Sequence, residues 1–325
     1  MAGLTGSSER DFARTAPPAD GEWITVPAAF FVGGEPPAFA LFDRNRRIAD
    51  LRIARTVYVS EGDCGALSVY LRRLLPVLRN SSSSGAAARA WALHRALKED
   101  LDEVLPLLAE DPERPMLMRH LIELSRLAAQ WVPAQPAAYL AELAQGAQSA
   151  SAHGVTTALF ALTLCAADGS ADVEALTAMT LAGLLADVGK LSMPDAILRK
   201  PGPLSPEEWD LTRRHPEQSV AQLMRAGVRS VPTLRAVRWH HERWSGGGYP
   251  DRLHGNEIPV EARILAIADA FAALTVDRPF TMGVRAYDAL TEMAGSEGHF
   301  DPRLLRTFVT AIGRAFPAPE RWGAA

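Results

Sequence analysis

Histidine and aspartate residues recur in four separate blocks in one part of the chain. The blocks are LLADVGK from Leu184, RRHPEQS from Arg213, WHHERWSGGGYP from Trp239 and ILAIADAFAALTVDRP from Ile264. Imidazole and carboxylate groups together suit iron, manganese or zinc. Phosphodiester hydrolysis benefits from two such ions about 3.5–4 Å apart, which activate water and neutralise phosphoryl charge. The blocks therefore indicate a metal site, and phosphodiester hydrolysis is one reaction that such a site supports.

The charged residues within these blocks need partners, whatever their role. Asp187 and Lys190 stand three residues apart, just after the apolar segment 172–185. Asp269 lies beside the apolar face of the segment 259–275. Burying a charged group without a partner is costly. A metal ion, an ion pair or a bound ligand is therefore implied at each position.

The histidines are ambiguous when each is taken alone. His215 precedes a proline at a helix junction, where an imidazole can simply cap a helix C-terminus. His240 and His241 are adjacent, and neighbouring helical residues point about 100° apart, so the pattern does not require both to face one metal. The glycine run Gly246–Gly248 allows the backbone to approach a ligand closely, but it also suits an ordinary flexible loop.

The overall composition is that of a soluble globular protein, with 48% hydrophobic and 22% charged residues among 325. Its net charge of −4 excludes non-specific nucleic-acid binding through a general electrostatic field. Two isolated cysteines, Cys64 and Cys165, favour a reducing compartment. No apolar run reaches the ~18 residues that span a bilayer, and no signal peptide is evident. We therefore expect a cytoplasmic protein without a membrane span.

The N-terminal part differs in pattern from the rest. Residues 1–20 are expected to be a disordered leader, and residues 21–80 a small β-rich or α/β module. Within the module, strands are predicted over 23–32, 38–42 and 56–59, and a helix over 66–78. The stretch NSSSSG at 80–85 reads as a linker that opens a helical linker region over 81–148. A helical domain over 149–316 and a tail over 317–325 follow.

From residue 86 onward the periodicity is helical, so the chain is predicted to be mainly α. Helices are expected over 86–108, 116–131, 137–147, 152–166, 172–185, 204–215, 231–243, 259–275, 286–293 and 303–312. The helix over 204–215 has a clear start, because Ser205 and Glu208 form a capping-box pattern around Pro206. His94 and His120, each alone on its helix, are interpreted as ordinary core or surface residues.

Nine short motifs occur in order between His153 and Ile312. They are DVGK at 187–190, KPGPL at 200–204, HPE at 215–217, HHERW at 240–244, GYP at 248–250, GNEIP at 255–259, ARILAIADAFAALT at 262–275, DRP at 277–279 and HFDP at 299–302. Together they resemble the HD-GYP family, a bacterial subgroup of the HD-domain metal-dependent phosphohydrolases. The resemblance implies an all-helical domain that hydrolyses cyclic di-GMP to linear pGpG or GMP, using a cluster of iron or other transition metals.

The resemblance also implies roles for individual residues. A first metal would be held by His153, Asp187 and Asp269, and a second by Asp187, His215, His240 and His241. Lys190 matches the family lysine near the scissile phosphate, where it would stabilise charge or protonate the leaving oxygen. The residues Gly248, Tyr249 and Pro250 match the loop that meets the guanine end of the ligand. Arg278 is a candidate phosphate contact, although an arginine there also suits a structural role.

Several positions depart from the family pattern. The His-Asp pair that gives the family its name is here Ala186-Asp187, so the first metal loses one protein ligand. Ser149 replaces the glutamate of members with three metals, so at most two ions, iron or manganese, are expected. Ser245 and Thr281 also replace residues that are usually acidic or amide and basic, respectively.

Two hypotheses follow from this mixture of retained and lost residues. In the first, the protein is a working, slow cyclic di-GMP phosphodiesterase, because Lys190, Asp187 and the whole second ligand set are retained. In the second, it is a degenerate receptor or interaction module that binds the nucleotide without cleaving it. A signalling protein partner would then dock through the N-terminal module.

Overall fold

The computed structural model describes four strands before residue 61, Tyr70, and residues 86–315 apart from 115–116, 144–148, 170–171 and 276–283. The chain divides into two compact units, Met1–Ala92 and Leu93–Ala325. The predicted leader (1–20), nearly all of the helix predicted at 66–78, the linker (80–85) and the tail (317–325) lie outside the described residues.

The first unit contains a four-stranded sheet in the order β1–β4–β2–β3. Its strands are β1 (Trp23–Pro27), β2 (Phe42–Asp43), β3 (Arg46–Arg47) and β4 (Thr56–Ser60). β1 and β4 pair antiparallel with Trp23 opposite Ser60, and β2 pairs antiparallel with both β3 and β4. β1 and β4 fall where strands were predicted, whereas β2 starts only at the last residue of the predicted 38–42 segment.

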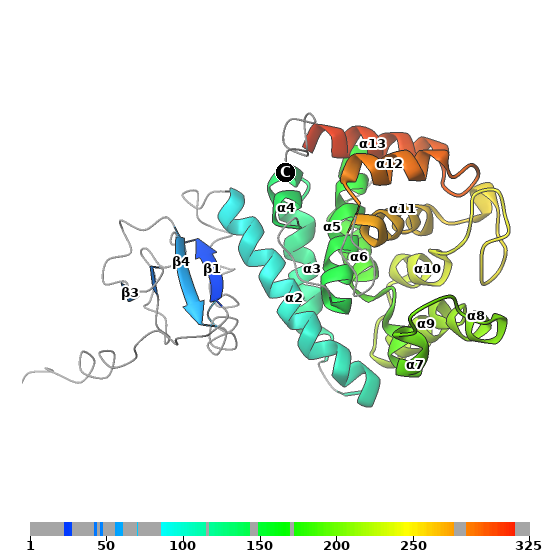
Figure 1. The fold of residues 1–325 in the computed structure, drawn as a ribbon, viewed down its shortest axis with the longest axis horizontal. Coiled ribbons are helices and arrows are strands. Elements are labelled where there is room, and N and C mark those ends of the chain that lie inside the picture. The colour runs from blue at the N-terminus through cyan, green and yellow to red at the C-terminus, as the bar shows by residue number, and fades with distance from the viewer. Residues whose placement is uncertain are drawn as a thin grey trace, which may run out of the picture. The chain divides into compact units, whose positions relative to one another are not determined.

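The second unit is helical throughout its described residues, as Figure 1 shows from cyan to red. Its elements, beginning with the long helix that enters it, are α2 (Ala86–Glu110), α3 (Arg119–Trp131), α4 (Pro136–Leu143), α5 (Ala150–Asp168), α6 (Val173–Leu185), the 3₁₀ turn η3 (Val188–Ser192), α7 (Asp195–Leu198), α8 (Pro206–Thr212), α9 (His215–Arg225), α10 (Val231–Trp239), the 3₁₀ turn η4 (Gly255–Glu257), α11 (Val260–Thr275), α12 (Ala286–Gly295) and α13 (Pro302–Ala315). The prediction of a mainly helical chain is confirmed for this unit.

The core of the helical unit is the crossing of α5 and α6, two helices buried on almost all sides. A Cβ added to Gly183 would lie 2.5 Å from the Cα of Ala158, and one added to Gly154 would lie 2.7 Å from the carbonyl oxygen of Leu184. Only glycine permits such a close backbone approach. This contact brings the start of α5, with His153, against the end of α6, just before Asp187.

Aromatic packing joins this crossing to two later helices. The ring centroid of Phe160 on α5 lies 4.7 Å from that of Phe271 on α11 and 6.0 Å from that of Phe308 on α13, in edge-to-face geometry. All three rings are buried. Such pairs add about 0.5–1.5 kcal/mol each to the burial of apolar area. The cluster therefore fixes α11, which carries Asp269, against α5, which carries His153.

Two segments of the described chain, Ala150–Asp168 and Val173–Ser192, are long and apolar enough to cross a membrane by length and composition. This differs from the expectation that no segment qualifies. However, 78% and 72% of the two apolar windows are buried among the other helices. A helix that is hydrophobic on all sides is also what the centre of a helical domain requires. We therefore interpret both as core helices.

Two predicted helix ends were wrong, and both lie at candidate site residues. α10 ends at Trp239 rather than at residue 243, which leaves His240 as its C-terminal cap. The reason is a close contact within the loop that follows: a Cβ on Gly248 would lie 2.4 Å from the Cα of Glu242, so the chain folds back on itself here. Similarly, α8 ends at Thr212 rather than at residue 215, and His215 begins α9. In contrast, α6 ends at Leu185 as predicted, and Asp187 lies between α6 and η3.

Candidate metal centre

The predicted ligand residues come from separate elements and meet in two overlapping clusters. One cluster consists of His153, Asp187 and Asp269, and the other of Asp187, His215, His240 and His241. In each cluster one ligand atom per residue lies within 4.8 Å of all the others. Asp187 belongs to both clusters. The arrangement therefore has the form of a two-ion site with a shared carboxylate.

The position of Asp187 depends on a close contact between η3 and α9. The amide of Gly189 donates a hydrogen bond to Ser219 Oγ, which donates to the carbonyl of Ala186, and both distances are 2.8 Å. A Cβ on Gly189 would lie 2.3 Å from the carbonyl oxygen of His215. This contact places Asp187 Oδ1 3.2 Å from His215 Nε2.

The two most buried histidines are oriented by backbone carbonyl groups. His215 Nδ1 donates to the carbonyl of Thr212 at 2.7 Å, and His240 Nδ1 donates to that of Val237 at 2.8 Å. Because a carbonyl can only accept, Nδ1 carries the proton and Nε2 of each neutral ring presents a lone pair. Fixing one nitrogen in this way is the usual preparation of the other as a metal ligand.

These lone pairs face a third one. Among the described residues, His215 Nε2, His240 Nε2 and Asp187 Oδ1 are buried and have no hydrogen-bond partner. The Asp187 oxygen lies 3.2 Å from the first nitrogen and 4.0 Å from the second. Buried acceptors that point at one another are costly unless a cation lies between them. The donor set therefore fits a divalent transition metal.

The protonation of the cluster suits cation binding. Burial lowers the pKa of His240 to about 4, and burial together with the neighbouring His240 holds the pKa of His241 well below its ordinary value. Burial alone would raise the pKa of Asp187, but Lys190 and His215 outweigh it and hold that pKa well below the usual range. His240 and His241 are thus neutral and Asp187 is ionised at neutral pH, which are the forms that bind metals.

The first cluster is arranged differently. His153 Nε2 lies 2.9 Å from Asp269 Oδ1 and 4.0 Å from Asp187 Oδ2. Burial raises the pKa of Asp269, but the hydrogen bond and charge of His153 reverse this and lower it overall. Lys190 Nζ lies 2.6 Å from Asp187 Oδ2. A cation could replace the proton shared by His153 and Asp269 and would then meet the same three side chains.

Ala186 contributes no ligand to the first cluster. It is buried and lines a cavity of about 190 Å³, together with His153, Asp187 and Asp269. Ser149, another departure from the family pattern, is the N-cap of α5 and accepts a hydrogen bond from the amide of Ala152. Its hydroxyl therefore serves to start the helix that presents His153.

A larger pocket adjoins the second cluster through His241 and Tyr249, whose rings stack with centroids 4.8 Å apart. Its volume is about 780 Å³, within the range of ligand sites. The predicted loop residues Gly248, Tyr249 and Pro250 all line it. Buried Glu242 holds this loop in place, because its carboxylate accepts a hydrogen bond of 2.7 Å from the backbone amide of Asp251.

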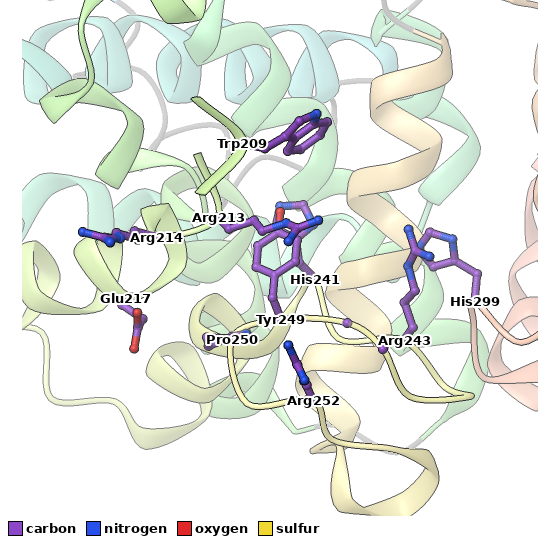
Figure 2. A pocket seen from close by; sticks show the side chains of 12 residues that line it. Trp209, Arg213, Arg214, Glu217, His241, Arg243, Tyr249, Pro250, Arg252 and His299 are labelled. Carbon is purple, nitrogen blue, oxygen red and sulfur yellow. The ribbon is translucent and has the colours of Figure 1, made fainter. Parts of the chain in front are cut away.

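Several residues of this pocket were not predicted from the sequence. Figure 2 shows Trp209 and Arg213 over Tyr249 and His241, Arg252 below Tyr249, and Arg243 beside His299. The available signals were the Arg213–Arg214 pair directly before His215 and the arginines on either side of the GYP motif. Isolated arginines are so common on protein surfaces that spacing alone does not identify them.

From the sequence, His94 and His120 were interpreted as ordinary residues and Arg278 as a candidate phosphate contact. Arg278 and Thr281 lie outside the described residues, so the proposed phosphate contact stays a prediction. His94 on α2 and His120 on α3 belong to neither cluster, and His120 Nδ1 instead lies 2.6 Å from buried Asp100 on α2. Burial is the main cause that lowers the pKa of His94 to about 4.

Parts of this chain are similar in sequence to known proteins. Residues 120–304 match the family model described as "HD domain". The chain is 44% identical over 133 residues to "Cyclic di-GMP phosphodiesterase PA4108" of Pseudomonas aeruginosa, covering 41% of this chain and 32% of the relative. It is 38% identical over 156 residues to "3'3'-cGAMP-specific phosphodiesterase 2" of Vibrio cholerae, covering 47% and 30%. It is 41% identical over 133 residues to "Cyclic di-GMP phosphodiesterase response regulator RpfG" of Xanthomonas campestris, covering 40% and 35%.

The chain thus spans about a third of the length of these curated relatives. Among solved structures, "Bd1817, a HDG"Y"P protein from Bdellovibrio bacteriovorus" has a similar fold, with a TM-score of 0.64 and 17% identity over 90% of this chain and 99% of that one. The family model covers more than half of the chain, including the residues of both clusters. The protein therefore belongs to the HD domain family.

Proposed function

We propose that this protein is an HD-GYP-type phosphodiesterase that hydrolyses cyclic di-GMP to linear pGpG or GMP. The observation that carries the proposal is the shared carboxylate of Asp187, which lies between two ligand clusters and faces two buried imidazole lone pairs. A bridged pair of cations is the arrangement that in-line displacement at phosphorus uses. The choice of cyclic di-GMP as the substrate is supported by relatives that are named as cyclic di-GMP phosphodiesterases and are 41–44% identical to this chain over 133 residues.

In this proposal the cations would be two at most, iron or manganese. His153, Asp187 and Asp269 would hold one, and Asp187, His215, His240 and His241 the other. When bound, the pair supplies an activated water and neutralises charge on the phosphoryl oxygens. The carbonyls that accept from Nδ1 of His215 and His240 turn Nε2 of each ring toward the cluster, and burial, which lowers the pKa of His240 to about 4, keeps that imidazole neutral.

Lys190 is the proposed charge-stabilising residue. Its Nζ lies 2.6 Å from Asp187 Oδ2, and its side chain is about a third exposed, at 33%. An ammonium held there faces the position of a phosphate that approaches the shared carboxylate. It would stabilise negative charge that develops on the phosphoryl or leaving oxygen, or donate a proton to the latter.

The proposal also extends to the rest of the chain. We propose that residues 149–316 are the catalytic domain, that residues 81–148 link it to an N-terminal module at 21–80, and that the module docks to a signalling protein. We also propose that the protein works in the cytoplasm. The buried, free thiol of Cys165 fits a reducing compartment.

The direct test uses the full chain, purified anaerobically and loaded with ferrous iron or manganese. Cyclic di-GMP is added, and the products are separated by liquid chromatography. We expect linear pGpG or GMP to appear, and Lys190→Gln to slow its formation by about 100-fold without loss of metal. Absence of product under both metal loadings, with both ions bound, would rule out the hydrolase.

A second candidate function is that of a cyclic di-GMP receptor, and Ala186 is the observation that favours it. This residue leaves the first cluster with three ligands beside a cavity of about 190 Å³. A receptor of this kind would bind cyclic di-GMP in the larger pocket without turnover. Calorimetry on the metal-loaded chain separates the two functions, because binding without product supports the receptor and product formation supports the hydrolase.

A further inference from the structure

The pocket beside the metal centre is lined by several positively charged side chains that are not metal ligands. Four arginines line it, namely Arg213, Arg214, Arg243 and Arg252, and Glu217 is its one acidic side chain. Glu217 is bound to Arg238 at 3.3 Å. Within the described part of the chain, none of the four arginines forms an ion pair with a carboxylate. The pocket therefore offers many free hydrogen-bond donors and few acceptors.

Arg213 stands out among the four because two aromatic rings flank it. Its guanidinium carbon lies 5.9 Å from the centroid of the Trp209 ring and 6.0 Å from that of Tyr249. Both rings also line the pocket, and Trp209 is 46% exposed. In Figure 2 Trp209 lies above Arg213, whose side chain overlaps the rings of Tyr249 and His241 in this view. An exposed tryptophan on the wall of a pocket is a surface on which a purine base can stack.

These residues are connected directly to the catalytic cluster. Arg213 is the C-terminal cap of α8 and stands two residues before His215, while Tyr249 stacks on His241. A ligand whose phosphate lies at the clusters can therefore reach Trp209 and Arg213 without leaving the pocket. A cavity of about 780 Å³ also exceeds what a single phosphate fills.

We infer that Trp209 and Arg213 form a purine-binding subsite for one base of a cyclic dinucleotide, and that Arg213 makes this subsite prefer guanine to adenine. The inference rests on the proposed function for the class of ligand. Guanine presents two acceptors, O6 and N7, to the fork of an arginine, whereas adenine presents one acceptor and one donor. A wall that offers donors but hardly any acceptors thus suits guanine and repels the adenine amino group.

The competing assignment is that Arg213 holds the second phosphate of the ligand. A lysine retains the charge that a phosphate needs but loses the planar fork that reads two acceptors. The test therefore compares wild-type protein, Arg213→Lys and Trp209→Leu for binding of cyclic di-GMP and of 3'3'-cGAMP. Dissociation constants are measured by calorimetry with excess chelator, so that no turnover interferes. Arg225→Lys, an exposed arginine paired with Glu113 on a different surface, is the control.

We expect the wild-type protein and Arg225→Lys to bind cyclic di-GMP about tenfold or more tightly than 3'3'-cGAMP. Arg213→Lys should bring this ratio close to one, and Trp209→Leu should weaken both ligands about tenfold. The subsite would be overturned if wild-type protein bound cyclic di-GMP and 3'3'-cGAMP equally well. It would also be overturned if Arg213→Lys weakened both ligands by the same factor and so left the ratio of their affinities unchanged. Thermal unfolding of each variant confirms that the fold is retained.

Failure of this inference is distinguishable from failure of the proposed function. Hydrolysis is measured separately on the metal-loaded chain, so a protein that binds with the expected guanine preference but forms no product keeps the subsite and loses the hydrolase. Conversely, product formation with no change of the guanine-to-adenine ratio in Arg213→Lys keeps the hydrolase and removes the subsite. If neither dinucleotide binds to the wild-type protein, the subsite is excluded.

Discussion

The two ligand clusters that meet at Asp187 differ in how completely the fold surrounds them. In the cluster with His215 and His240, the two imidazoles are 1% and 0% exposed and their Nδ1 atoms are anchored on backbone carbonyls. In the other, His153 and Asp269 are 21% and 16% exposed and lie beside a cavity next to Ala186.

This difference separates a preorganised site from an incomplete one. A ligand set that is already turned and desolvated binds its ion with little reorganisation, and supporting hydrogen bonds alone are worth about 10–100-fold in affinity. The second cluster has that support, and the first lacks both the support and one ligand. We therefore expect the His215–His240 cluster to hold its ion more tightly than the His153–Asp269 cluster.

The largest expected effect follows from removing the carboxylate of Asp187, which both clusters share. Asp187→Asn keeps the shape of the side chain but loses the charge that can join two cations. We expect both ions to be lost and kcat/KM for cyclic di-GMP to fall about 1,000-fold, or about 4 kcal/mol. Elemental analysis and product chromatography measure the two quantities. Asp195→Asn, an exposed carboxylate on α7, is the control, and a variant that keeps both ions would show that the clusters are independent.

The next effect concerns the contact that positions Asp187 for both clusters. In Gly189→Ala the new Cβ would meet the carbonyl of His215 at 2.3 Å, so η3 and α9 must separate. We expect the free energy of unfolding to fall by about 3 kcal/mol, as in an overpacked core. Urea denaturation measures it. Gly313→Ala on α13, where a Cβ meets nothing within 4 Å, should be neutral or stabilising, and equal behaviour of the two variants would contradict the argument.

The third prediction concerns pH and distinguishes the clusters directly. Burial holds the pKa of His240 at about 4 in the folded chain, against an ordinary 6.5 when unfolded. The unfolded chain therefore takes up a proton first as pH falls, so this stability is present above pH 6.5 and is lost between 6.5 and about 4. In the presence of chelator, His240 should contribute a loss of about 2 kcal/mol between pH 7 and pH 5.

Urea unfolding at the two pH values measures this loss. His240→Gln should show a correspondingly smaller pH dependence, while His153→Gln in the other cluster should keep the His240 contribution. An unchanged dependence in His240→Gln would mean that the buried imidazole is not the group that titrates.

The smallest expected effect is that of a substitution that adds the missing ligand to the weaker cluster, the one with His153 and Asp269. Ala186→His places an imidazole beside the cavity that Ala186 now lines, and it should raise the affinity of the first ion about tenfold. Manganese titration followed by elemental analysis measures the occupancy of each equivalent added. Turnover should rise in parallel if the first ion is needed for hydrolysis. The His153–Asp269 cluster should bind the second equivalent of manganese, because it is the weaker site. If Ala186→His binds this equivalent no more tightly than wild-type protein, the missing ligand does not explain the difference between the clusters.

Much of this architecture was predictable because local patterns carry it. The capping box of Ser205 and Glu208 and the helical segments that form α5 and α6 follow from residue types at fixed spacing. The candidate ligands were also identified from their residue types and from the order of motifs, and the structure brings them within 4.8 Å in each cluster.

Other features depended on contacts that helical spacing does not describe, whether the residues are a few or many positions apart in the chain. Helical periodicity carried α10 to residue 243, but the packing of Gly248 against Glu242 ends the helix at Trp239. Arg213 and Trp209 acquire significance only because Tyr249, 36 and 40 positions away, returns to the same pocket, with its ring centroid 6.0 Å from the guanidinium carbon of Arg213.

The sequence by itself determined which residues can bind a metal, that Ala186 cannot, and which segments are helical, since these depend on side-chain chemistry and short-range spacing. Only the tertiary structure decided that these ligand atoms lie within 4.8 Å of one another in each cluster, that His215 and His240 present Nε2, and that four arginines share one pocket with an exposed tryptophan. The physical reason is that ligand direction, burial and electrostatic environment arise from the packing of helices whose contacts span over 100 residues, as between His153 and Asp269.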